Sequence, residues 1–305
     1  MARLNISLPE DVYALAVKWR RRVNLSEICA RALRSELEAA ESHRSAQALF
    51  SALRSPSTLE RTLAVRYKLS EVVVPEITQD TTDVREALGN AAATYLNRYL
   101  CDGSLLAIGG GRQMWCVVKN LTPRQVSVRI TGLGIRQNDP QVLHAHANTL
   151  TTLLWLLYSP RAKAHLVGEA LDTVWTADLP SAPYPKYFVV GSCGPFNATC
   201  PLANLLGEEA ATHLLKQQVC GDFLYCFFDQ DGRLAPAPPL PHQSILPADL
   251  LQRLSLRADT RVILVAGGLE KLKIIKFALT VGMCNVLITD PATTQRLLDV
   301  NVEEI

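Results

Sequence analysis

The stretch LLAIGGGRQM, residues 105–114, indicates the fold of most of the chain. Four apolar residues in a row are typical of a short strand that is buried on both faces, and the three glycines after them end the strand before a helix begins. Such strands occur in parallel sheets, because the helices that connect parallel strands cover both faces. The stretch therefore predicts one strand–helix unit of an α/β fold.

The same alternation of apolar strands and helices fills the chain from residue 71 onward. Further strands are expected at VSVRITGLG (126–134), AHLVG (164–168), YFVVGS (187–192), DFLYCFF (222–228), RVILVAGG (261–268) and NVLITD (285–290). Helices are expected over 83–100, 147–159, 201–218 and 270–281, with a last helix after residue 290. The pattern predicts a Rossmann-like, mainly parallel sheet over residues 71–305.

The composition and charge of the chain indicate a globular protein with a separate basic segment. Of its 305 residues, 48% are hydrophobic and 20% are charged. Residues 1–70 hold 12 Lys and Arg against 7 Asp and Glu, whereas the remainder holds 19 against 22. This asymmetry favours a polyanion-binding module at the front of the chain. No apolar run is long enough for a membrane span or a signal peptide, so we expect a cytoplasmic protein. The eight cysteines form no CxxC pair and are expected as reduced, buried thiols, with no cofactor.

The first forty residues predict a strand followed by two helices. Along residues 3–8 the apolar Leu4, Ile6 and Leu8 alternate with the polar Arg3, Asn5 and Ser7. A first helix is expected after Pro9 and a second after Ser26, whose side chain can cap the helix. So short a unit cannot bury its own apolar faces, so we expect it to pair with a second copy.

This segment resembles the ribbon-helix-helix DNA-binding domains of the MetJ, Arc and CopG type over residues 2–41. The resemblance implies a two-stranded ribbon inserted in the major groove of double-stranded DNA, in a domain over 1–45. The segment that follows is rich in Ser, Arg and Ala, and a partly helical linker is expected over 46–70. The resemblance also implies base contacts from Arg3, Asn5 and Ser7 and a phosphate clamp at Ser26 and Glu27. The alternative is a strand that serves only to join two copies.

Two glycine loops behind predicted strands are candidates for anion binding. In the first, Gly109, Gly110 and Gly111 let backbone amides approach an anion, and Arg112 and Gln113 follow. The alternative is a tight turn, and the loop lacks the spacing of an ATP or NAD site. In the second loop, Gly268 precedes Lys271. A lysine in the first turn of a helix opposes the helix dipole, which favours a bound anion there.

Two further stretches carry polar side chains that could contact a ligand. Asp222, beside an apolar strand, could accept hydrogen bonds from sugar hydroxyls, or could bond to nearby backbone amides instead. In HAHANTL (144–150), His144 and His146 have a spacing that some metal sites use, but no third ligand is nearby. A helix start is the more natural interpretation of the stretch, and polar ligand contacts from His146 and Asn148 are favoured over a metal site.

These stretches together resemble the sugar-binding domain of the SorC family, which is related to DeoR-type regulators and to the phosphosugar isomerase fold. AIGGGRQM, HAHANTL, VVGSCGPF, CGDFLYCFFDQDGR, AGGLEK and NVLITDPATTQRLL follow one another in the family's order and spacing, over nearly all of residues 71–305. The resemblance implies phosphate recognition at residues 109–113 and Lys271, sugar-hydroxyl contact at Asp222, and further contacts at His146 and Asn148. The family usually has Thr or Ser where this chain has Arg112 and Gln113, and a helix-turn-helix at its N-terminus.

The resemblance implies a transcription regulator whose effector is a phosphorylated sugar or related metabolite, assembled as a homodimer or homotetramer. The sign of the response, and hence whether the protein is a repressor, stays open. The alternative is a phosphosugar isomerase-like enzyme, for which Asp222, Glu270 or His146 would have to supply the base. A third alternative is a scaffolding or antitoxin-like protein that uses its front segment only to dimerise.

Overall fold

A computed structural model describes residues 56–77, 83–135, 140–167, 184–240 and 243–299. The chain divides into two compact units, Met1–Arg54 and Ser55–Ile305, and the described residues all belong to the second. The ribbon-helix-helix prediction, with Arg3, Asn5, Ser7, Ser26 and Glu27, lies outside the described residues. Part of the predicted linker is described, and it contains helix α4 (Thr58–Arg66).

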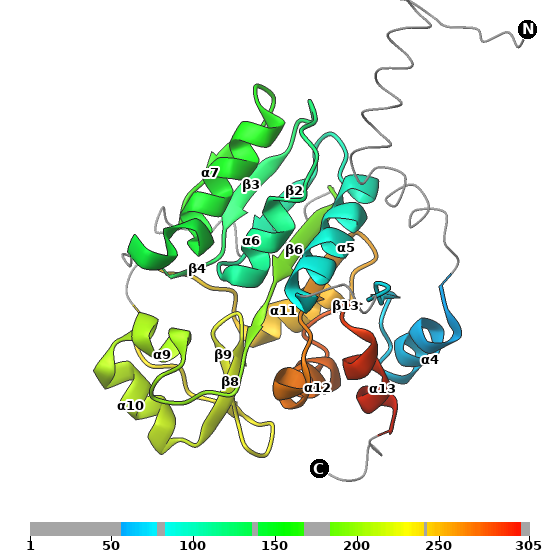
Figure 1. The fold of residues 1–305 in the computed structure, drawn as a ribbon. Coiled ribbons are helices and arrows are strands. Elements are labelled where there is room, and N and C mark those ends of the chain that lie inside the picture. Colours follow the sequence, from blue (N-terminus) through cyan, green and yellow to red (C-terminus); the bar gives the residue numbers. More distant parts are fainter. Residues whose placement is uncertain (1–55, 78–82, 136–139, 168–183, 241–242, 300–305) are drawn as a thin grey trace, which may run out of the picture. The chain divides into compact units, whose positions relative to one another are not determined.

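A seven-stranded, entirely parallel sheet forms the centre of the second unit (Figure 1), which confirms the predicted α/β class. The strand order is β1-β13-β12-β6-β2-β3-β5. The strands are β1 (Glu71–Val73), β2 (Leu105–Ile108), β3 (Arg129–Gly132), β5 (Lys163–His165), β6 (Lys186–Val190), β12 (Thr260–Val265) and β13 (Val286–Ile288). Their central members are short apolar runs, as expected for strands covered on both faces.

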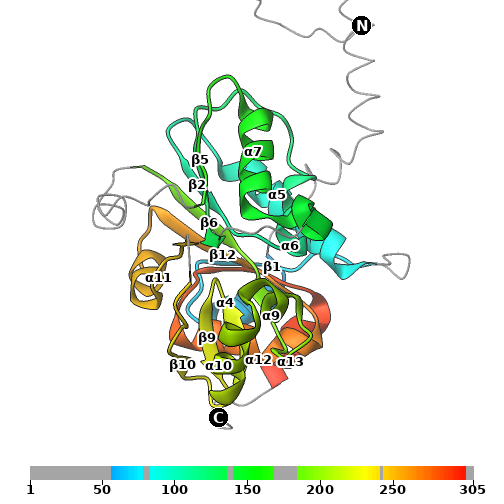
Figure 2. The same cartoon turned by 90° about the vertical axis from the view of Figure 1, so that its left-hand side faces the viewer.

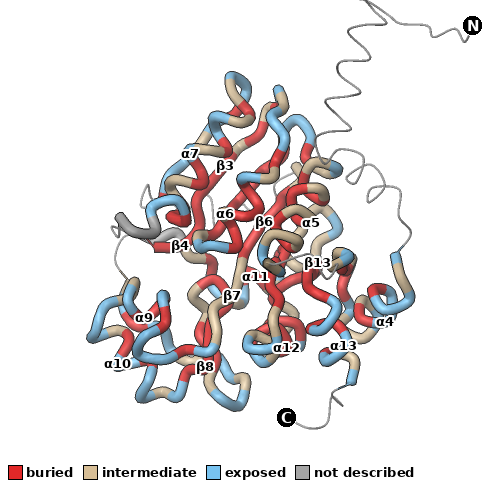
Figure 3. The backbone as a smooth tube through the Cα atoms, in the orientation of Figure 1, coloured by how far each residue is buried: buried red, intermediate tan, exposed pale blue. Residues whose placement is uncertain are grey.

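Helices cover both faces of this sheet (Figures 1 and 2). One layer consists of α5 (Val84–Tyr99), α6 (Arg112–Val118) and α7 (Ala147–Tyr158). The other consists of α4, α11 (Ala248–Ser255), α12 (Leu272–Val281) and α13 (Pro291–Asp299). Strand β2 shows how the layers are separated, because Leu106 and Ile108 pack in the first core whereas Leu105 and Ala107 pack in the second. Figure 3 shows the resulting band of buried strands between more exposed helices.

A smaller antiparallel sheet branches from the end of β6. Its order is β10-β9-β8-β7, with β7 (Ser192–Cys193), β8 (Val219–Phe223), β9 (Cys226–Asp229) and β10 (Leu234–Ala235). Helices α9 (Pro201–Leu206) and α10 (Glu208–Lys216) pack on it around a third apolar core. Strand β4 (Gly134–Ile135), which follows β3, pairs with β11 (Gln243–Ser244), which precedes α11.

Two predicted elements are each divided into two in the structure. The single helix expected over 201–218 is broken between α9 and α10 at Gly207, whose φ of 85° does not fit a helix. The single strand expected at DFLYCFF is a hairpin, because the chain turns at Leu224 and Tyr225 between β8 and β9. Both residues have positive φ, at 50° and 63°, and a two-residue turn of this kind normally carries Asn or Gly. Leu224 and Tyr225 are not typical turn residues, so the sequence gives no sign of the turn and predicts one strand where the structure has two.

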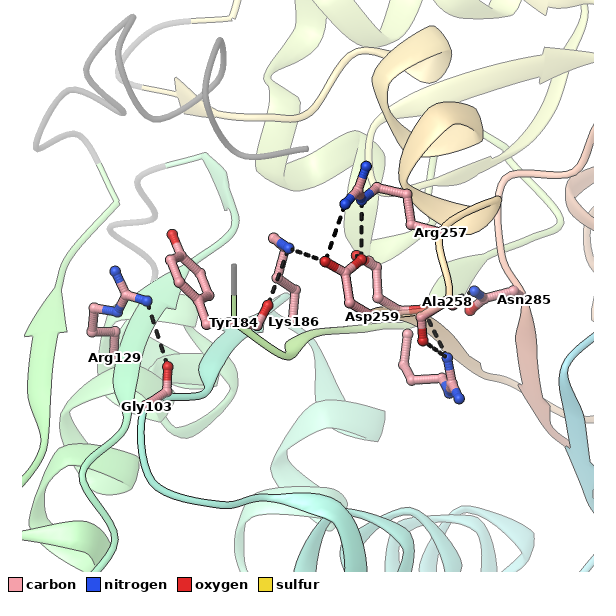
Figure 4. Close-up of polar contacts among 10 residues, drawn as sticks. Gly103, Arg129, Tyr184, Lys186, Arg257, Ala258, Asp259 and Asn285 are labelled. Atoms are coloured by element: carbon pink, nitrogen blue, oxygen red, sulfur yellow. Dashed lines mark hydrogen bonds and ion pairs between the residues drawn. The ribbon is translucent and has the colours of Figure 1, made fainter. Parts of the chain in front are cut away.

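A polar network fixes the amino ends of the central strands (Figure 4). The Lys186 side chain is fully buried at the start of β6, and its Nζ lies 3.0 Å from Asp259 Oδ2 and donates to the Tyr184 carbonyl at 3.1 Å. Arg257 also pairs with Asp259, and the Arg129 guanidinium lies 3.6 Å from the centre of the Tyr184 ring. Burial alone would raise the pKa of Asp259, but hydrogen bonds from Arg257 and Lys186 outweigh it and lower the pKa to about 2.

Among the described residues, no helix is long and apolar enough to cross a membrane. The seven cysteines in the described part of the chain are all free thiols.

Candidate functional site

The strand order places a topological switch point between β2 and β6. After β2 the chain passes through α6 on one face of the sheet to β3, toward the β5 edge. After β6 it passes through the smaller sheet and α11, on the opposite face, to β12, toward the β1 edge. Neighbouring strands whose connections diverge in this way open the carboxyl edge of the sheet, where α/β proteins bind ligands. We therefore call residues 109–113, 133–134 and 191–193, which follow β2, β3 and β6, the switch-point loops.

The first of these loops contains the three glycines, and two of their amides already have partners. Gly109 N donates to the Val189 carbonyl at 2.9 Å and Gly111 N donates to the Ala145 carbonyl at 2.7 Å. Gly111 has a φ of 109° and is exposed, and Gly110 is half-buried. The outer part of the loop is thus the accessible part, and an anion there would meet the Gly110 backbone.

Arg112 and Gln113 begin helix α6 and point to different surroundings. Arg112 is exposed. Gln113 is buried, and its side-chain amide donates to the Arg85 carbonyl near the start of α5 at 3.0 Å. Of the two predicted contacts, Arg112 is therefore accessible to a ligand in solution, whereas Gln113 ties α6 to α5.

The start of α7 lies against the loops that follow β2 and β3. The Ala145 carbonyl, just before α7, accepts the hydrogen bond from Gly111, and His146 occupies the N-cap position of the helix and is buried. Asn148 Oδ1 accepts from Val167 N at 2.6 Å and would lie 3.5 Å from a Cβ at Gly132. The predicted residues His146 and Asn148 are thus next to the switch-point loops. No group of three metal-ligating side chains occurs among the described residues.

Asp222 lies beside the loop that follows β6, in β8, which pairs with β7. Its side chain is 6% exposed, and both carboxylate oxygens accept backbone hydrogen bonds: Oδ1 from Cys193 N at 3.2 Å and Oδ2 from Tyr225 N at 2.7 Å. Burial raises the pKa of Asp222 to about 6, although these hydrogen bonds act in the opposite direction. Asp222 therefore connects the loop after β6 to the turn between β8 and β9.

That turn, Leu224 and Tyr225, we call the hairpin tip. Leu224 is 4% exposed, and its Cδ1 would lie 3.8 Å from a Cβ at Gly109. The Tyr225 ring lies over Gly134, with Cε2 3.1 Å from the Cβ position of that glycine. The tip therefore contacts the segments that leave β2 and β3, and Asp222 ties it to the segment that leaves β6.

The second glycine loop follows β12 and is shaped by a residue that the sequence analysis missed. Asp290, at the carboxyl end of β13, is 4% exposed, and its Oδ2 accepts from Gly268 N at 2.8 Å and from the Thr293 hydroxyl at 2.6 Å. A Cβ at Gly267 would lie only 2.4 Å from the same oxygen. The Asp-Pro pair before the last predicted helix was a possible signal, because Asp is a common helix cap.

Lys271 lies ahead of α12 rather than in its first turn. It ends a short 3₁₀ turn, Leu269–Lys271, and is half-exposed. Its charge acts on the Cys193 thiol. Burial and the Asp222 charge raise the pKa of this thiol, the Lys271 charge lowers it, and the resulting pKa is about 12. Lys271 therefore supplies positive charge toward the loop after β6, although its position removes the argument from the helix dipole.

Comparisons with known proteins agree with this fold. A "Deoxyribonucleoside regulator" of Bacillus subtilis (strain 168) is 26% identical over an alignment of 255 residues, with 78% of this chain and 78% of that one covered. The solved structure of the full-length sorbitol operon regulator SorC from Klebsiella pneumoniae matches with a TM-score of 0.62 at 21% identity, covering 94% of this chain and 97% of that one. The probable sor operon regulator from Shigella flexneri matches with a TM-score of 0.61 at 21% identity, covering 79% and 98%.

A family model described as "Putative sugar-binding domain" matches residues 51–154 and 186–299, which is more than half of the chain. The matched residues include the loops after β2, β3, β6 and β12. This chain therefore belongs to the family of sugar-binding domains that SorC- and DeoR-type transcriptional regulators contain.

Proposed function

We propose that this protein is a DNA-binding transcriptional regulator whose effector, a phosphorylated sugar or related metabolite, binds over the switch-point loops. The observation that carries the proposal is the convergence of three loops and a buried carboxylate at the switch point of a sugar-binding domain. Ligands of open α/β sheets bind at such a point. A regulator of this kind works in the cytoplasm, where it meets its DNA.

The charges near the loops favour an anionic group on the effector. Arg112 is exposed at the end of the first loop, and Lys271 acts on Cys193 in the loop after β6. In this proposal the phosphate lies near Gly110, Arg112 and Lys271, with the Gly109, Gly111 and Gly268 backbone shaping the site. The sugar lies toward Asp222, His146 and Asn148, and Gln113 supports the loop from behind.

The surroundings of Asp222 argue against a catalytic base. A general base for sugar isomerisation must reach the substrate. Asp222 is only 6% exposed, and both of its oxygens accept backbone hydrogen bonds that hold the side chain in place within the protein. The relatives named above are regulators. We therefore propose a regulator and not an isomerase.

The DNA-binding part of the proposal rests on residues 1–45. A ribbon-helix-helix domain requires two copies, so the proposal includes a homodimer or a homotetramer. Arg3, Asn5 and Ser7 would contact base edges, and Ser26 and Glu27 would lie at the phosphate backbone. Effector binding would change the affinity for DNA only if the effector prefers one of the two DNA-binding states.

A thermal-shift screen of the full chain tests the effector class. The panel contains ribose 5-phosphate, 2-deoxyribose 5-phosphate, glucose 6-phosphate and fructose 6-phosphate, each with its unphosphorylated sugar, and deoxyribonucleosides because one relative is named for them. We expect at least one sugar phosphate to raise the melting temperature and its sugar to have little effect. Stabilisation by none of them, or steady turnover of any of them, contradicts the proposal.

Substitution of Lys271 tests the phosphate position. Loss of one charged hydrogen bond to a phosphate corresponds to about 1.5–3 kcal/mol, or roughly ten- to hundred-fold in affinity. Lys271→Ala should weaken the sugar phosphate by that factor and leave the free sugar unchanged, in calorimetric titration. Lys216→Ala, which removes an exposed lysine on α10, is the matched control. Equal losses for sugar and sugar phosphate would remove Lys271 from the phosphate site.

DNA fragments selected in vitro by the full chain then test the regulator. The sugar phosphate that stabilises the protein should change the affinity for the selected DNA, and a chain that lacks residues 1–45 should not bind that DNA. Retained DNA binding by the shortened chain would refute the assignment of the DNA-binding domain.

A further inference from the structure

We propose that the hairpin tip, Leu224 and Tyr225, is a cover over the switch-point loops that a sugar phosphate must displace, and that Tyr225 controls which ligands enter. The inference rests on the proposed function for the identity of the ligand. The evidence for the cover itself comes from the contacts, the backbone conformation and the attachment of the tip.

The contacts of the tip show what it covers. Leu224 is 4% exposed and lies on Gly109, directly after β2, and the Tyr225 ring lies on Gly134, two residues after β3. β2 is one of the two strands at the switch point, and β3 is its neighbour. The two side chains of the tip therefore cover the loop after β2 at its start and the loop after β3. Gly110 and Arg112, farther along the loop after β2, stay accessible.

The backbone of the tip is strained. Lys68, Gln218, Leu224 and Tyr225 are the non-glycine residues with positive φ in the described part of the chain, and only the last two are adjacent. A side chain in the left-handed region costs roughly 1–2 kcal/mol, and an aromatic or branched residue is unusual there. Strain of this kind persists only where other contacts hold it, and it is common in segments that move on binding. The tip is therefore held by its contacts and not by its own turn preference.

Hydrogen bonds to Asp222 attach the tip to the loop after β6. Asp222 accepts hydrogen bonds from Tyr225 N and from Cys193 N, so one carboxylate holds the tip to the loop after β6. The pairing of β8 with β9 shifts register between Val219 and Gly221, just before Asp222. A bulge in a strand is a common way to direct a hairpin end toward a functional site. These features give the hairpin a defined closed position over the loops.

The cover lowers the apparent affinity for any ligand that needs the space beneath it. If the site is open only part of the time, the measured dissociation constant is the intrinsic constant divided by the open fraction. Removing the Tyr225 side chain frees the space over Gly134 and relaxes the left-handed backbone, because glycine adopts positive φ without penalty. A sugar phosphate should therefore bind Tyr225→Gly more tightly than it binds the natural chain.

The first experiment needs no ligand. Hydrogen–deuterium exchange of the full chain compares a peptide over residues 221–228 with one over residues 260–266, which contains β12. A cover that opens locally should exchange about ten-fold or more faster than the central strand. Exchange of both peptides at the same rate means that the tip opens only when the unit unfolds, and this result would overturn the proposal whatever the ligand is.

The second experiment measures dissociation constants of ribose 5-phosphate, 2-deoxyribose 5-phosphate and glucose 6-phosphate by calorimetry. Tyr225→Gly should bind at least one of them about three- to ten-fold more tightly than the natural chain. Gln218→Gly is the matched control, because it relieves a positive φ of 55° at an exposed residue before β8 and leaves the tip intact.

The outcomes separate the cover from the proposed function. Weaker or unchanged binding by Tyr225→Gly would overturn the cover, and weaker binding would make Tyr225 a ligand contact. If none of the three compounds binds any variant and the wider thermal-shift panel gives no ligand, the proposed effector class fails, and the exchange experiment alone decides the cover. Tyr225→Asn repeats the test should the glycine variant fail to fold, since asparagine also tolerates positive φ.

Discussion

The substitution Asp222→Asn tests how much the buried charge of Asp222 changes the free energy of unfolding. Burial is the main influence on Asp222 and raises its pKa from 3.8 to about 6, against the opposing effect of the two backbone hydrogen bonds. One pKa unit corresponds to about 1.4 kcal/mol. Ionising Asp222 therefore costs about 3 kcal/mol more in the folded protein than in the unfolded chain.

The direction of the pH dependence follows from the raised pKa. Between pH 3.8 and about 6 the folded protein retains a proton on Asp222 that the unfolded chain has lost. The contribution of Asp222 to stability is thus complete below the lower value and falls as the pH rises through the upper one. Asparagine does not titrate, and the other groups are common to both proteins. The natural chain should therefore lose about 3 kcal/mol relative to Asp222→Asn between about pH 4 and about pH 7.

Urea unfolding at a series of pH values measures this difference. Tryptophan fluorescence provides the signal, because Trp115 on α6 and Trp155 on α7 belong to the unit that contains Asp222. A difference that does not change with pH would show that Asp222 has the same pKa in both states. If the natural chain instead gains stability relative to Asp222→Asn as the pH rises, the backbone hydrogen bonds outweigh burial, and the reasoning is refuted.

Three further substitutions probe other parts of the molecule. Asp259→Asn removes the carboxylate that pairs with the fully buried Lys186 and should lower the free energy of unfolding by about 2–3 kcal/mol. The expected loss is smaller than for a fully buried pair because the Asp259 side chain is about one-third exposed. A loss no greater than that caused by Arg257→Ala would contradict the importance of this pair. Gly221→Ala places a Cβ 2.4 Å from the Cys193 carbonyl oxygen and should lower the free energy of unfolding by about 2 kcal/mol or more. Gly191→Ala, whose Cβ would have its nearest neighbour at 3.8 Å, should lower it by less than about 1 kcal/mol. Similar losses for the two variants in urea unfolding would refute the steric argument. Arg3→Ala should weaken DNA binding by about 1–3 kcal/mol and relax base preference in a binding-site selection, and unchanged selectivity would exclude a base contact.

The strands and the glycine loops could be predicted from the sequence because they depend on local composition. Runs such as LLAI (105–108) and VILV (262–265) are apolar on both faces, and parallel sheets require this. Glycines at 109–111 and 267–268 mark where two of these strands end. Since the carboxyl ends of parallel strands lie on one edge, the strand pattern alone was enough to assign the residues behind them to a common edge.

The arrangement of side chains within the site could not be predicted in the same way. Gln113 turns to the Arg85 carbonyl, and Asp222 is occupied by two backbone amides, because of contacts made across the fold. The hairpin tip has no glycine, asparagine or proline to mark the turn. Asp290 shapes the second glycine loop from a different strand. Each of these features depends on partners far away in the sequence, which local patterns do not report.

Among the described residues, the two edges of the sheet differ in how firmly their segments are held. At the amino edge, Asp259 pairs with the fully buried cation of Lys186, and breaking this pair would remove a carboxylate that offsets a buried charge. At the carboxyl edge, the hairpin tip is held by apolar contacts and by Asp222, whose ionised form is itself disfavoured by burial. Displacing the tip would expose this carboxylate to water, which recovers part of the cost of its charge. The cost of opening the tip is thereby reduced near neutral pH, so ligand affinity through the cover should decrease when Asp222 is protonated below about pH 6.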